Sequence, residues 1–421
     1  MILYKGSIFE TDKQDHLIAS LDDDIKLILR SGLTPKVEDV IFACDTLASK
    51  ILAGEFDSIV RPFLETFNVS DEYFRSLCDM FSKEGLKRKL SVELSDKEQI
   101  IDGRYLRKRY PLGVLLHIAA GNFDILPAYS VVEGLLAGNI NILKLPAGDS
   151  GLSVMLLSEI IKICPSLAEF IFVFDVPSTE TESLVKLASL ADGIAVWGGD
   201  TAVAAARKLA PVNTKIISWG HKLSFAYCTP DATDHELKLL ASSICMTNQT
   251  LCSSCQGIFV DTTSDEELDA FGKRFFDILT GINKSFKPAD LGMRAKNSIN
   301  VYNECLEQYK TGSLILADNG ISVIVRRDSE LELSYMYRSV WVKKLRREDI
   351  CLLHKHKNHL QTAAVLVPDK DLRESICESL ISAGVVRIAS AGNMSRSIPG
   401  EAHDGTYALR EYSRIVETEF F

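Results

Sequence analysis

The hydrophobic pattern of the chain changes near residue 100. Residues 1–100 carry Leu and Ile every three or four positions among Asp and Lys, as in HLIASLDDDIKLILRSGL and VEDVIFACDTLASKIL, which predicts a set of amphipathic helices. The polar stretch SDKEQIIDGRY at residues 95–105 is predicted to be a hinge. From residue 111 onward, short apolar runs alternate with longer helical patterns, so a different architecture is expected there.

The alternation beyond residue 111 predicts a parallel sheet. Its apolar runs are typical of strands buried on both faces, and helical segments of about 10–15 residues separate them. One of these helices, DTAVAAARKLA, is predicted to have Asp200 as its N-cap. Strands and helices in this order indicate a doubly wound α/β fold, with a second α/β region after about residue 230. The apolar runs are LGVLLHIAAGN, INILKLP, EFIFVFDVP, DGIAVWGG and TKIISWG.

The carboxyl ends of the predicted strands are the expected ligand site, because open α/β sheets bind ligands there. These ends are rich in Gly, Ala, Ser and Pro, and two of them lead into helix N-termini that could face a phosphate. No GxGxxG motif occurs in the chain, so a dinucleotide would bind without that fingerprint. The five ends are AAGN (119–122), KLPAGDS (144–150), FDVPS (174–178), WGGD (197–200) and SWGHK (218–222).

Composition and charge argue against several classes of protein. A chain of 421 residues is long enough for two or three domains with their own cores. The net charge of -10 and the lack of a Lys/Arg-rich block argue against a nucleic-acid-binding protein. No apolar stretch reaches the about 20 residues of a membrane span, and the first residues lack a signal-peptide pattern. We therefore expect a cytoplasmic protein whose Cys residues are reduced thiols.

The stretch TNQTLCSSCQ at residues 247–256 places Cys252 and Cys255 three positions apart. A CxxC motif fits a metal site, a dithiol redox site, or one nucleophile with a bystander. Cys252 lies on a polar turn after a predicted helix, which suits an exposed reactive thiol. As a nucleophile it would need positive charge or a helix N-terminus to lower its free pKa of roughly 8.5. A buried structural thiol is the general expectation for a cysteine, and we keep it for Cys255.

The metal and redox alternatives find less support in the sequence. A zinc site needs two further ligands at suitable spacing. The segment HKHKNH offers His354, His356 and His359, but lysines lie among them and no second CxxC occurs. This segment is expected to be a solvated surface, and no metal is predicted. A dithiol redox site normally lies in a thioredoxin-like βαβ unit, whereas this motif follows a large dinucleotide-type domain.

Three separated motifs resemble the LuxC-type acyl-CoA reductases, a branch of the aldehyde dehydrogenase superfamily. The stretch YPLGVLLHIAAGNFDILPAYSVVEGLLAGNINILKLPAGDSGLS resembles the first strand–helix–strand of that family, and NQTLCSSCQ resembles its nucleophile motif. GVVRIASAGNM and AHDGTYALREYSRIVE are similar to its closing segment. The resemblance runs from about residue 104 to 421, and the first hundred residues match loosely.

The resemblance implies an aldehyde-dehydrogenase-like domain organisation. A cofactor domain with a doubly wound parallel sheet would be followed by a second α/β domain that carries the catalytic cysteine. The expected regions are an N-terminal helical region (1–100), a dinucleotide-binding domain (101–229), a catalytic domain (230–390) and a C-terminal segment (391–421) that returns to the crevice.

The resemblance also assigns roles to individual residues. Cys252 would be the acyl-accepting nucleophile, and the Asn122 amide would help hold the oxyanion, which needs donors about 3 Å away. Lys144 would contact the adenosine ribose or its phosphate. As alternatives, Asn122 caps the helix that begins near Asp124, and Lys144 extends from a strand end. The remaining cofactor residues would be Pro146, Gly198, Gly199 and Thr201, with His403 a candidate for the active-site rim.

Two positions depart from the patterns of these relatives. Hydrolytic aldehyde dehydrogenases carry a glutamate base in an ELGGK segment, and here SWGHK has Ser218 at that position. Without a base to activate water, an acyl thioester persists until a hydride or another thiol meets it, which favours thioester reduction over oxidation to the acid. Ala402 stands where we expect proline, and the HDG that follows it is equally well a simple turn.

The resemblance implies NADPH-dependent reduction of a fatty acyl-CoA or acyl-protein thioester to the fatty aldehyde. NADH is the alternative cofactor, because Lys144 could serve either. The implied partners are the acyl donor, an acyl-transferring protein and further copies of this chain in a homo-oligomer. Two other functions stay open: a reductase of acyl phosphates, with basic groups around a small polar substrate, and a non-catalytic scaffold with the same fold.

Overall fold

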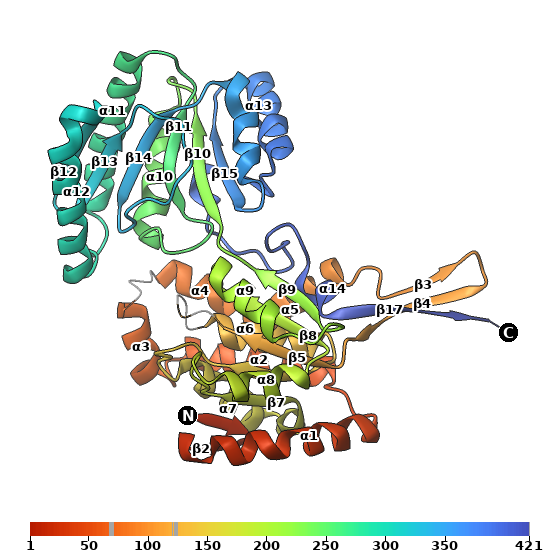
Figure 1. Cartoon of the computed structure of the whole chain (residues 1–421). Coiled ribbons are helices and arrows are strands. Elements are labelled where there is room, and N and C mark those ends of the chain that lie inside the picture. Colours follow the sequence, from red (N-terminus) through yellow and green to blue (C-terminus); the bar gives the residue numbers. More distant parts are fainter. Residues whose placement is uncertain (67–70, 120, 122–124, 421) are drawn as a thin grey trace. The chain divides into compact units, whose positions relative to one another are not determined.

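The computed structural model describes residues 1–66, 71–119, 121 and 125–420 (Figure 1). The chain forms two compact units, and each contains a seven-stranded sheet. The assignment of cofactor binding and catalysis to separate domains stays a prediction. The first unit consists of Met1–Arg61, Phe74–Gly220 and Ser397–Phe421, and the second of Pro62–Tyr73 and His221–Arg396.

The central strands of the first sheet are parallel and doubly wound. The chain enters the middle of the sheet with β5, adds β6 and β7 on one side, and then crosses to add β8 and β9 on the other. Nearly every residue of β5 to β8 is buried, which confirms the predicted α/β fold. The strands are β5 (Val114–Ile118), β6 (Ile140–Lys144), β7 (Ile171–Phe174), β8 (Gly193–Trp197) and β9 (Lys215–Trp219).

The helices that connect these strands pack in two groups. α6 and α7, which follow β5 and β6, contact each other and α2, whereas α8 contacts α9 and α1. In a doubly wound sheet these groups cover opposite faces, so the strands between them read as continuous apolar runs. The helices of this part of the chain are α1 (Gln14–Ser31), α2 (Val37–Leu52), α3 (Asp57–Thr66), α4 (Asp71–Phe81), α5 (Lys83–Glu93), α6 (Leu126–Leu136), α7 (Leu152–Ile163), α8 (Thr181–Ser189), α9 (Asp200–Leu209) and α14 (Ala408–Glu411).

The N-terminal region is helical, as predicted, but it begins with a hairpin. β1 (Ile2–Tyr4) pairs antiparallel with β2 (Ser7–Phe9) and extends the first sheet beside β7. α2 shows the expected amphipathic pattern, with Val40, Cys44 and Leu47 among its buried residues. The hairpin was missed because strands of three residues are too short to show an alternating pattern.

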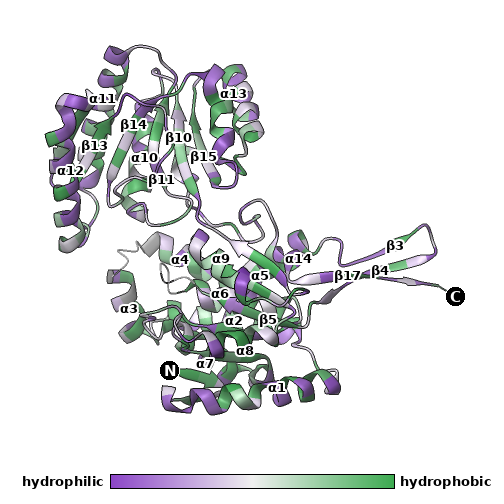
Figure 2. Cartoon of the chain, in the orientation of Figure 1, coloured by the Kyte–Doolittle hydropathy of each residue, from purple (hydrophilic) through white to green (hydrophobic). Residues whose placement is uncertain are grey.

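The segment at residues 95–105 is not the predicted hinge but part of a second hairpin. β3 (Glu98–Ile101) pairs with β4 (Tyr105–Pro111), and β17 (Ser413–Glu419) pairs with the other edge of β4. An ion pair of 2.9 Å joins Lys108 to Glu98 across the strands. Hydrophilic positions recur along these strands (Figure 2). The charged residues of the predicted hinge are therefore partly paired within a three-stranded sheet.

The second unit is built on six parallel strands with one antiparallel strand at the edge. This sheet confirms the second α/β region expected from the sequence. Its strands, in spatial order, are β12 (Leu314–Asp318), β13 (Ile321–Val325), β14 (Ser339–Lys344), β11 (Cys255–Val260), β10 (Leu223–Cys228), β15 (Leu360–Leu366) and β16 (Arg387–Ala389). Its helices include α10 (Asp234–Thr247), α11 (Asp265–Asn283), α12 (Leu291–Thr311) and α13 (Lys370–Ala383).

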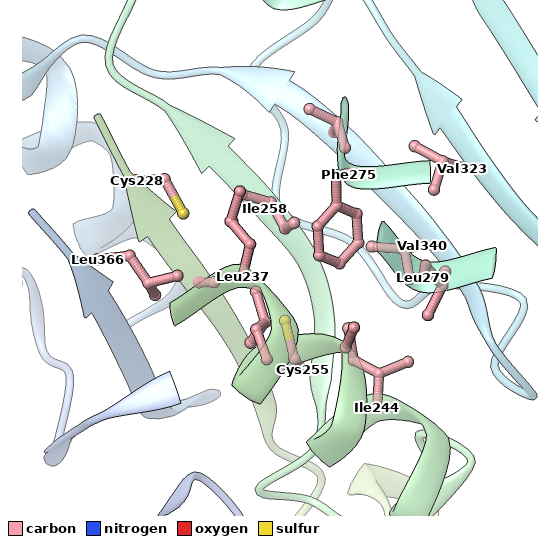
Figure 3. Packing of buried hydrophobic residues seen from close by; sticks show 14 of the residues in the cluster. Cys228, Leu237, Ile244, Cys255, Ile258, Phe275, Leu279, Val323, Val340 and Leu366 are labelled. Carbon is pink, nitrogen blue, oxygen red and sulfur yellow. The ribbon is translucent and has the colours of Figure 1, made fainter. Parts of the chain in front are cut away.

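Hydrophobic clusters cover both faces of the second sheet. On the face covered by α10 and α11, Ile244, Cys255 and Phe275 belong to one continuous cluster (Figure 3). On the other face, residues of α13 and of the 3-10 helix Arg347–His356 pack with Trp341. Because β11 contributes to both clusters, its position is fixed by packing from two sides.

A buried polar network connects the C-terminal segment to the first sheet. His117 on β5 bonds Ser130 Oγ through Nδ1 (2.7 Å) and Asn141 Oδ1 through Nε2 (3.0 Å). Trp197 Nε1 donates to the same serine oxygen at 3.1 Å, and the Tyr412 hydroxyl lies 3.3 Å from it. Burial lowers the pKa of His117 to about 4, so this ring is neutral at pH 7.

We predict that this histidine makes the fold sensitive to mild acid. The unfolded chain binds a proton at His117 near pH 6.5 whereas the folded chain resists it down to about pH 4, so stability falls as the pH drops through this window. Between pH 7 and 5 the wild type should lose about 2 kcal/mol more than His117→Gln. Urea unfolding followed by tryptophan fluorescence measures the difference, with exposed His16→Gln as the control. Equal losses in wild type and His117→Gln would contradict the prediction.

Candidate active site

The Cys252 loop lies between a helix end and a strand start in the second unit. α10 ends at Thr247, and Asn248 and Gln249 turn the chain in the left-handed region, with φ of 47° and 62°. Cys252 is exposed, and β11 begins three residues later at Cys255. The loop precedes β11, so the thiol lies at the amino end of that strand.

Buried amide side chains hold the loop from inside. Gln249 Nε2 donates to the Cys255 carbonyl oxygen at 2.9 Å and to the Ser339 carbonyl oxygen at 3.1 Å. Gln256 Nε2 in turn donates to the Gln249 carbonyl oxygen at 3.1 Å, and the Ser334 hydroxyl donates to Gln256 Oε1 at 2.7 Å. A buried polar group left without these bonds would cost about 1–3 kcal/mol, so each bond favours this one loop conformation.

Arg338 supports the same loop from β14's amino end. Its buried guanidinium donates to Asn248 Oδ1 at 3.1 Å through Nε and to the Lys287 carbonyl oxygen at 2.7 Å through Nη2. Met336, Tyr337 and Arg338 all have positive φ, and the Tyr337 N–H donates to the Asn248 carbonyl oxygen at 2.8 Å. Non-glycine residues in this region cost about 1–3 kcal/mol each, which these bonds help to offset.

Cys252 itself is contacted by two strands. The Ser224 hydroxyl on β10 donates to the Cys252 carbonyl oxygen at 2.7 Å. Gln361 Nε2 on β15 donates to Cys252 Sγ at 3.3 Å. The next residue, Ser253, has its hydroxyl 3.1 Å from that of Ser395. The thiol is thus exposed while its backbone is fixed.

Cys255 is in a different environment. Its side chain lies in the hydrophobic cluster under α10 (Figure 3), and its thiol donates to the Gly257 carbonyl oxygen at 3.2 Å. Burial raises the pKa of Cys255 to about 12, so it stays protonated at neutral pH. Such a thiol is a poor nucleophile and a poor metal ligand. Among the residues that the structure describes, no group of three or more His, Cys, Asp or Glu side chains could hold a metal ion.

In the first unit, several expected cofactor residues lie at the carboxyl edge of the sheet. Lys144 ends β6, is largely buried, and donates from Nζ to Ser178 Oγ at 3.3 Å. Burial lowers the pKa of Lys144, although Asp175 acts in the opposite direction. Within the described ranges, Lys144 forms no salt bridge, and Asp175 is the acidic residue that favours its charged form. Pro146, two residues after Lys144, is buried.

The second part of this edge is the turn after β8. Gly198 adopts φ of 152°, and its N–H donates to the Trp219 carbonyl oxygen at 3.1 Å. Gly199, not the expected Asp200, is the N-cap of α9, because the helix begins at Asp200 itself. A Cβ added to Gly199 would meet no atom within 4 Å. Thr201 is exposed in the first turn, so this helix start is open to a ligand.

His403 lies at the same edge. Its ring packs against the rings of Trp197 and Trp219, each with a centroid distance of 5.1 Å, and these tryptophans end β8 and β9. The expected oxyanion residue, Asn122, lies outside the described residues. Ser218 is exposed on β9. Cys252 belongs to the second unit, and the other described candidates belong to the first.

A comparison with known protein families shows which family this chain belongs to. The model of the family described as acyl-CoA reductase (LuxC) matches residues 33–415. The chain belongs to the acyl-CoA reductase (LuxC) family. The match includes the Cys252 loop and begins well before residue 104, so more of the chain is related to the LuxC family than its motifs suggested.

Relatives in the LuxC family are similar over most of this chain. The long-chain acyl-protein thioester reductase of Vibrio harveyi is 24% identical over 338 residues, which are 78% of this chain and 69% of that protein. The long-chain acyl-protein thioester reductase of Aliivibrio fischeri is 24% identical over 324 residues, or 74% of this chain and 65% of that protein. The chain thus spans roughly two thirds of the length of these relatives.

Solved structures confirm that this LuxC family member has the aldehyde dehydrogenase fold. Methylmalonate-semialdehyde dehydrogenase (DddC) from Oceanimonas doudoroffii matches with a TM-score of 0.77 at 13% identity, covering 100% of this chain and 97% of that one. Glyceraldehyde-3-phosphate dehydrogenase GapN from Methanocaldococcus jannaschii, complexed with NADP, has a TM-score of 0.74 at 13% identity and covers 97% and 94%. No helix in the described part of the chain is long and apolar enough to cross a membrane.

The sequence motifs do not predict the residues that hold the Cys252 loop in this LuxC family member. Gln249 and Gln256 lie inside the motif, but the sequence predicts only a polar turn around Cys252 and not buried amide side chains. Ser224, Arg338 and Gln361 are distant in the sequence and carry no local signal. The available signal is a glutamine or asparagine at a helix end that precedes a buried strand, because such a side chain can form hydrogen bonds inside the protein.

We predict that iodoacetamide distinguishes the two cysteines of the motif. Cys252 is exposed whereas Cys255 is buried with a raised pKa, so brief treatment at pH 8 should label Cys252 and leave Cys255 unmodified. Tandem mass spectrometry of the tryptic peptide 239–273 measures both sites. Labelling of Cys255 in the folded protein at a rate similar to that of Cys252 would contradict the structure.

Proposed function

We propose that the protein reduces a thioester-activated fatty acyl group to the fatty aldehyde, with NADPH as reductant and Cys252 as nucleophile. The observation that carries this proposal is the exposed Cys252 thiol on a rigidly held loop, in a chain of the acyl-CoA reductase (LuxC) family. The acyl donor is an acyl-protein or acyl-CoA thioester, since the relatives are named long-chain acyl-protein thioester reductases. On the same resemblance, we propose an acyl-transferring partner protein and a homo-oligomer.

Cys252 performs the first step as a thiolate. Its sulfur attacks the acyl carbonyl carbon, and the bond from that carbon to the carrier sulfur breaks, so the carrier leaves as a thiolate and the acyl group stays on Cys252. The oxyanion that forms on the way needs nearby N–H donors, for which the Cys252 backbone N–H and Asn122 are the candidates. The Ser224 hydroxyl donates to the Cys252 carbonyl oxygen, which belongs to the peptide group after the nucleophile, and so restrains the backbone on that side of Cys252.

The nicotinamide dinucleotide fits the carboxyl edge of the first sheet. Lys144 would contact the adenosine ribose or its phosphate, because it is a cation held near a strand end without a salt bridge to the described residues. Gly198, Gly199 and Thr201 would face the remainder of the cofactor, since the open N-terminus of α9 suits a phosphate. When bound, the reduced nicotinamide supplies a hydride to the acyl carbon.

Collapse of the hemithioacetal on Cys252 completes the reaction. The carbonyl reforms, the bond between carbon and Sγ breaks, and Cys252 leaves as a thiolate, so the aldehyde is released and the nucleophile is regenerated. Ser218 supports reduction over hydrolysis, because a hydroxyl cannot replace a carboxylate as a base that activates water. The same departure disfavours aldehyde oxidation to the acid as the main activity.

The product and its dependence on Cys252 test the proposal. With a long-chain acyl-CoA and NADPH, the wild type should form fatty aldehyde, and Cys252→Ser should lose the activity by about 1,000-fold or more. Cys255→Ala is the matched control and should keep the wild-type product, because that thiol lies in the core. Mass spectrometry of the aldehyde together with NADPH absorbance measures both. Aldehyde formation by Cys252→Ser at the wild-type rate would overturn the mechanism.

A second variant tests the cofactor site. Lys144→Met should weaken NADPH binding by about tenfold or more and NADH binding less, if the ammonium contacts the additional phosphate. Exposed Lys186→Met on α8 is the matched control for loss of a positive charge. Titration of cofactor fluorescence measures the affinities. Equal NADPH affinity for Lys144→Met and wild type would contradict the assigned contact.

A further inference from the structure

Gln361 reaches the Cys252 thiol from a strand that none of the sequence motifs includes. It is the second residue of β15, and only 6% of its surface is exposed. Its side-chain Nε2 lies 3.3 Å from Cys252 Sγ and donates to it. A buried amide is therefore directed at an exposed thiol.

An irregularity in the sheet accompanies this contact. Along β10 and β15, Leu223 pairs with Leu360, but Phe225 already pairs with Ala363, so β15 has one extra residue between these pairs. The extra residue falls in the stretch that contains Gln361. The pairing of β10 with β11 has a similar shift in register next to Ser224, and there the extra residue of β11 comes directly after the Cys252 loop. Such bulges redirect side chains and occur next to active sites.

Buried hydrogen bonds fix the distance between Gln361 and Cys252. The Thr362 N–H donates to Ser224 Oγ at 3.1 Å, and the Ser224 hydroxyl donates onward to the Cys252 carbonyl oxygen at 2.7 Å. Ser224 and Thr362 are both almost fully buried. Neighbouring residues of β15 thus hold the backbone of Cys252 through Ser224 and its sulfur through Gln361.

We infer that Gln361 is a positioning residue that stabilises the Cys252 thiolate and directs its sulfur toward the acyl carbon. A hydrogen bond donated to a charged acceptor favours the charged form, and it is stronger than one donated to a neutral acceptor. The glutamine amide keeps this donor at every pH, unlike a histidine or lysine. The inference rests on the proposed function only in taking Cys252 as the nucleophile.

Other charged and titratable groups flank the segments that contact the loop. His221 and His359 precede β10 and β15, and the His359 Nδ1 lies 3.1 Å from the His221 carbonyl oxygen. Arg387 donates to the carbonyl oxygens of Met394 and Arg396, on either side of Ser395. These groups are unchanged in the variants below, so differences between variants report on Gln361.

The test compares the pH dependence of Cys252 alkylation in the full-length protein. Gln361→Leu removes the donor at similar volume, and Gln361→Glu replaces it with a group that is negative at neutral pH. Exposed Gln99→Leu on β3 is the matched control, and exposed Cys305 in each protein is the internal reference. Iodoacetamide labelling of each site is quantified by peptide mass spectrometry over a range of pH.

We expect the alkylation midpoint of Cys252 to rise from wild type to Gln361→Leu and again to Gln361→Glu. A shift of about one pH unit slows labelling at pH 7 by about tenfold. Cys305 and the Gln99→Leu protein should show no change. A structural role alone would alter accessibility at every pH without moving the midpoint. Unchanged midpoints in both Gln361 variants would overturn the inference, and Gln361→Glu decides the matter if Gln361→Leu does not fold.

Failure of the inference and failure of the proposed function give different results. The alkylation test needs no acyl substrate, so a shifted midpoint supports the role of Gln361 even if no acyl donor reacts. Conversely, aldehyde formation that depends on Cys252, together with unchanged midpoints, leaves the proposed function intact and rejects the role of Gln361.

Discussion

The need to satisfy buried polar groups determines how the Cys252 loop is built. Gln249, Gln256 and Arg338 are enclosed within the second unit, and their hydrogen bonds connect the end of α10 to the starts of β11 and β14. In a low-dielectric interior, the loss of any of these hydrogen bonds would leave a buried polar group unsatisfied, so the bonds favour the observed loop conformation. An exposed thiol on a rigid support is the consequence.

The same sheet places the two cysteines of the motif in different environments. β11 begins at Cys255, so that side chain enters the hydrophobic cluster, whereas Cys252 lies in the preceding loop and reaches solvent. The bulged pairing around Ser224 then places a hydroxyl and an amide against Cys252. The arrangement of these strands therefore both packs the hydrophobic core and positions the Cys252 thiol.

The sequence predicted the parallel sheets well, because strands buried on both faces have a continuous apolar pattern. It also predicted that Cys252 lies on an exposed turn, because a polar break between ordered elements is visible locally, whereas the role of Cys252 as nucleophile stays a prediction. It did not predict the three-stranded sheet, in which β17 pairs with β4 from a distant part of the chain. Nor could it reveal Gln361, because a bulge and a contact between distant residues leave no periodic signal. Asn122 lies outside the described residues, so its role stays a prediction.

The proposed reaction depends on transfer of an acyl group to Cys252, and intact-mass spectrometry detects this transfer. The protein is mixed with a long-chain acyl-CoA in the absence of reduced nicotinamide. We expect a mass increase of one acyl group, located at Cys252 and lost when NADPH is added. An adduct at another residue, or none with acyl-CoA or acyl-protein donors of any chain length, would contradict it.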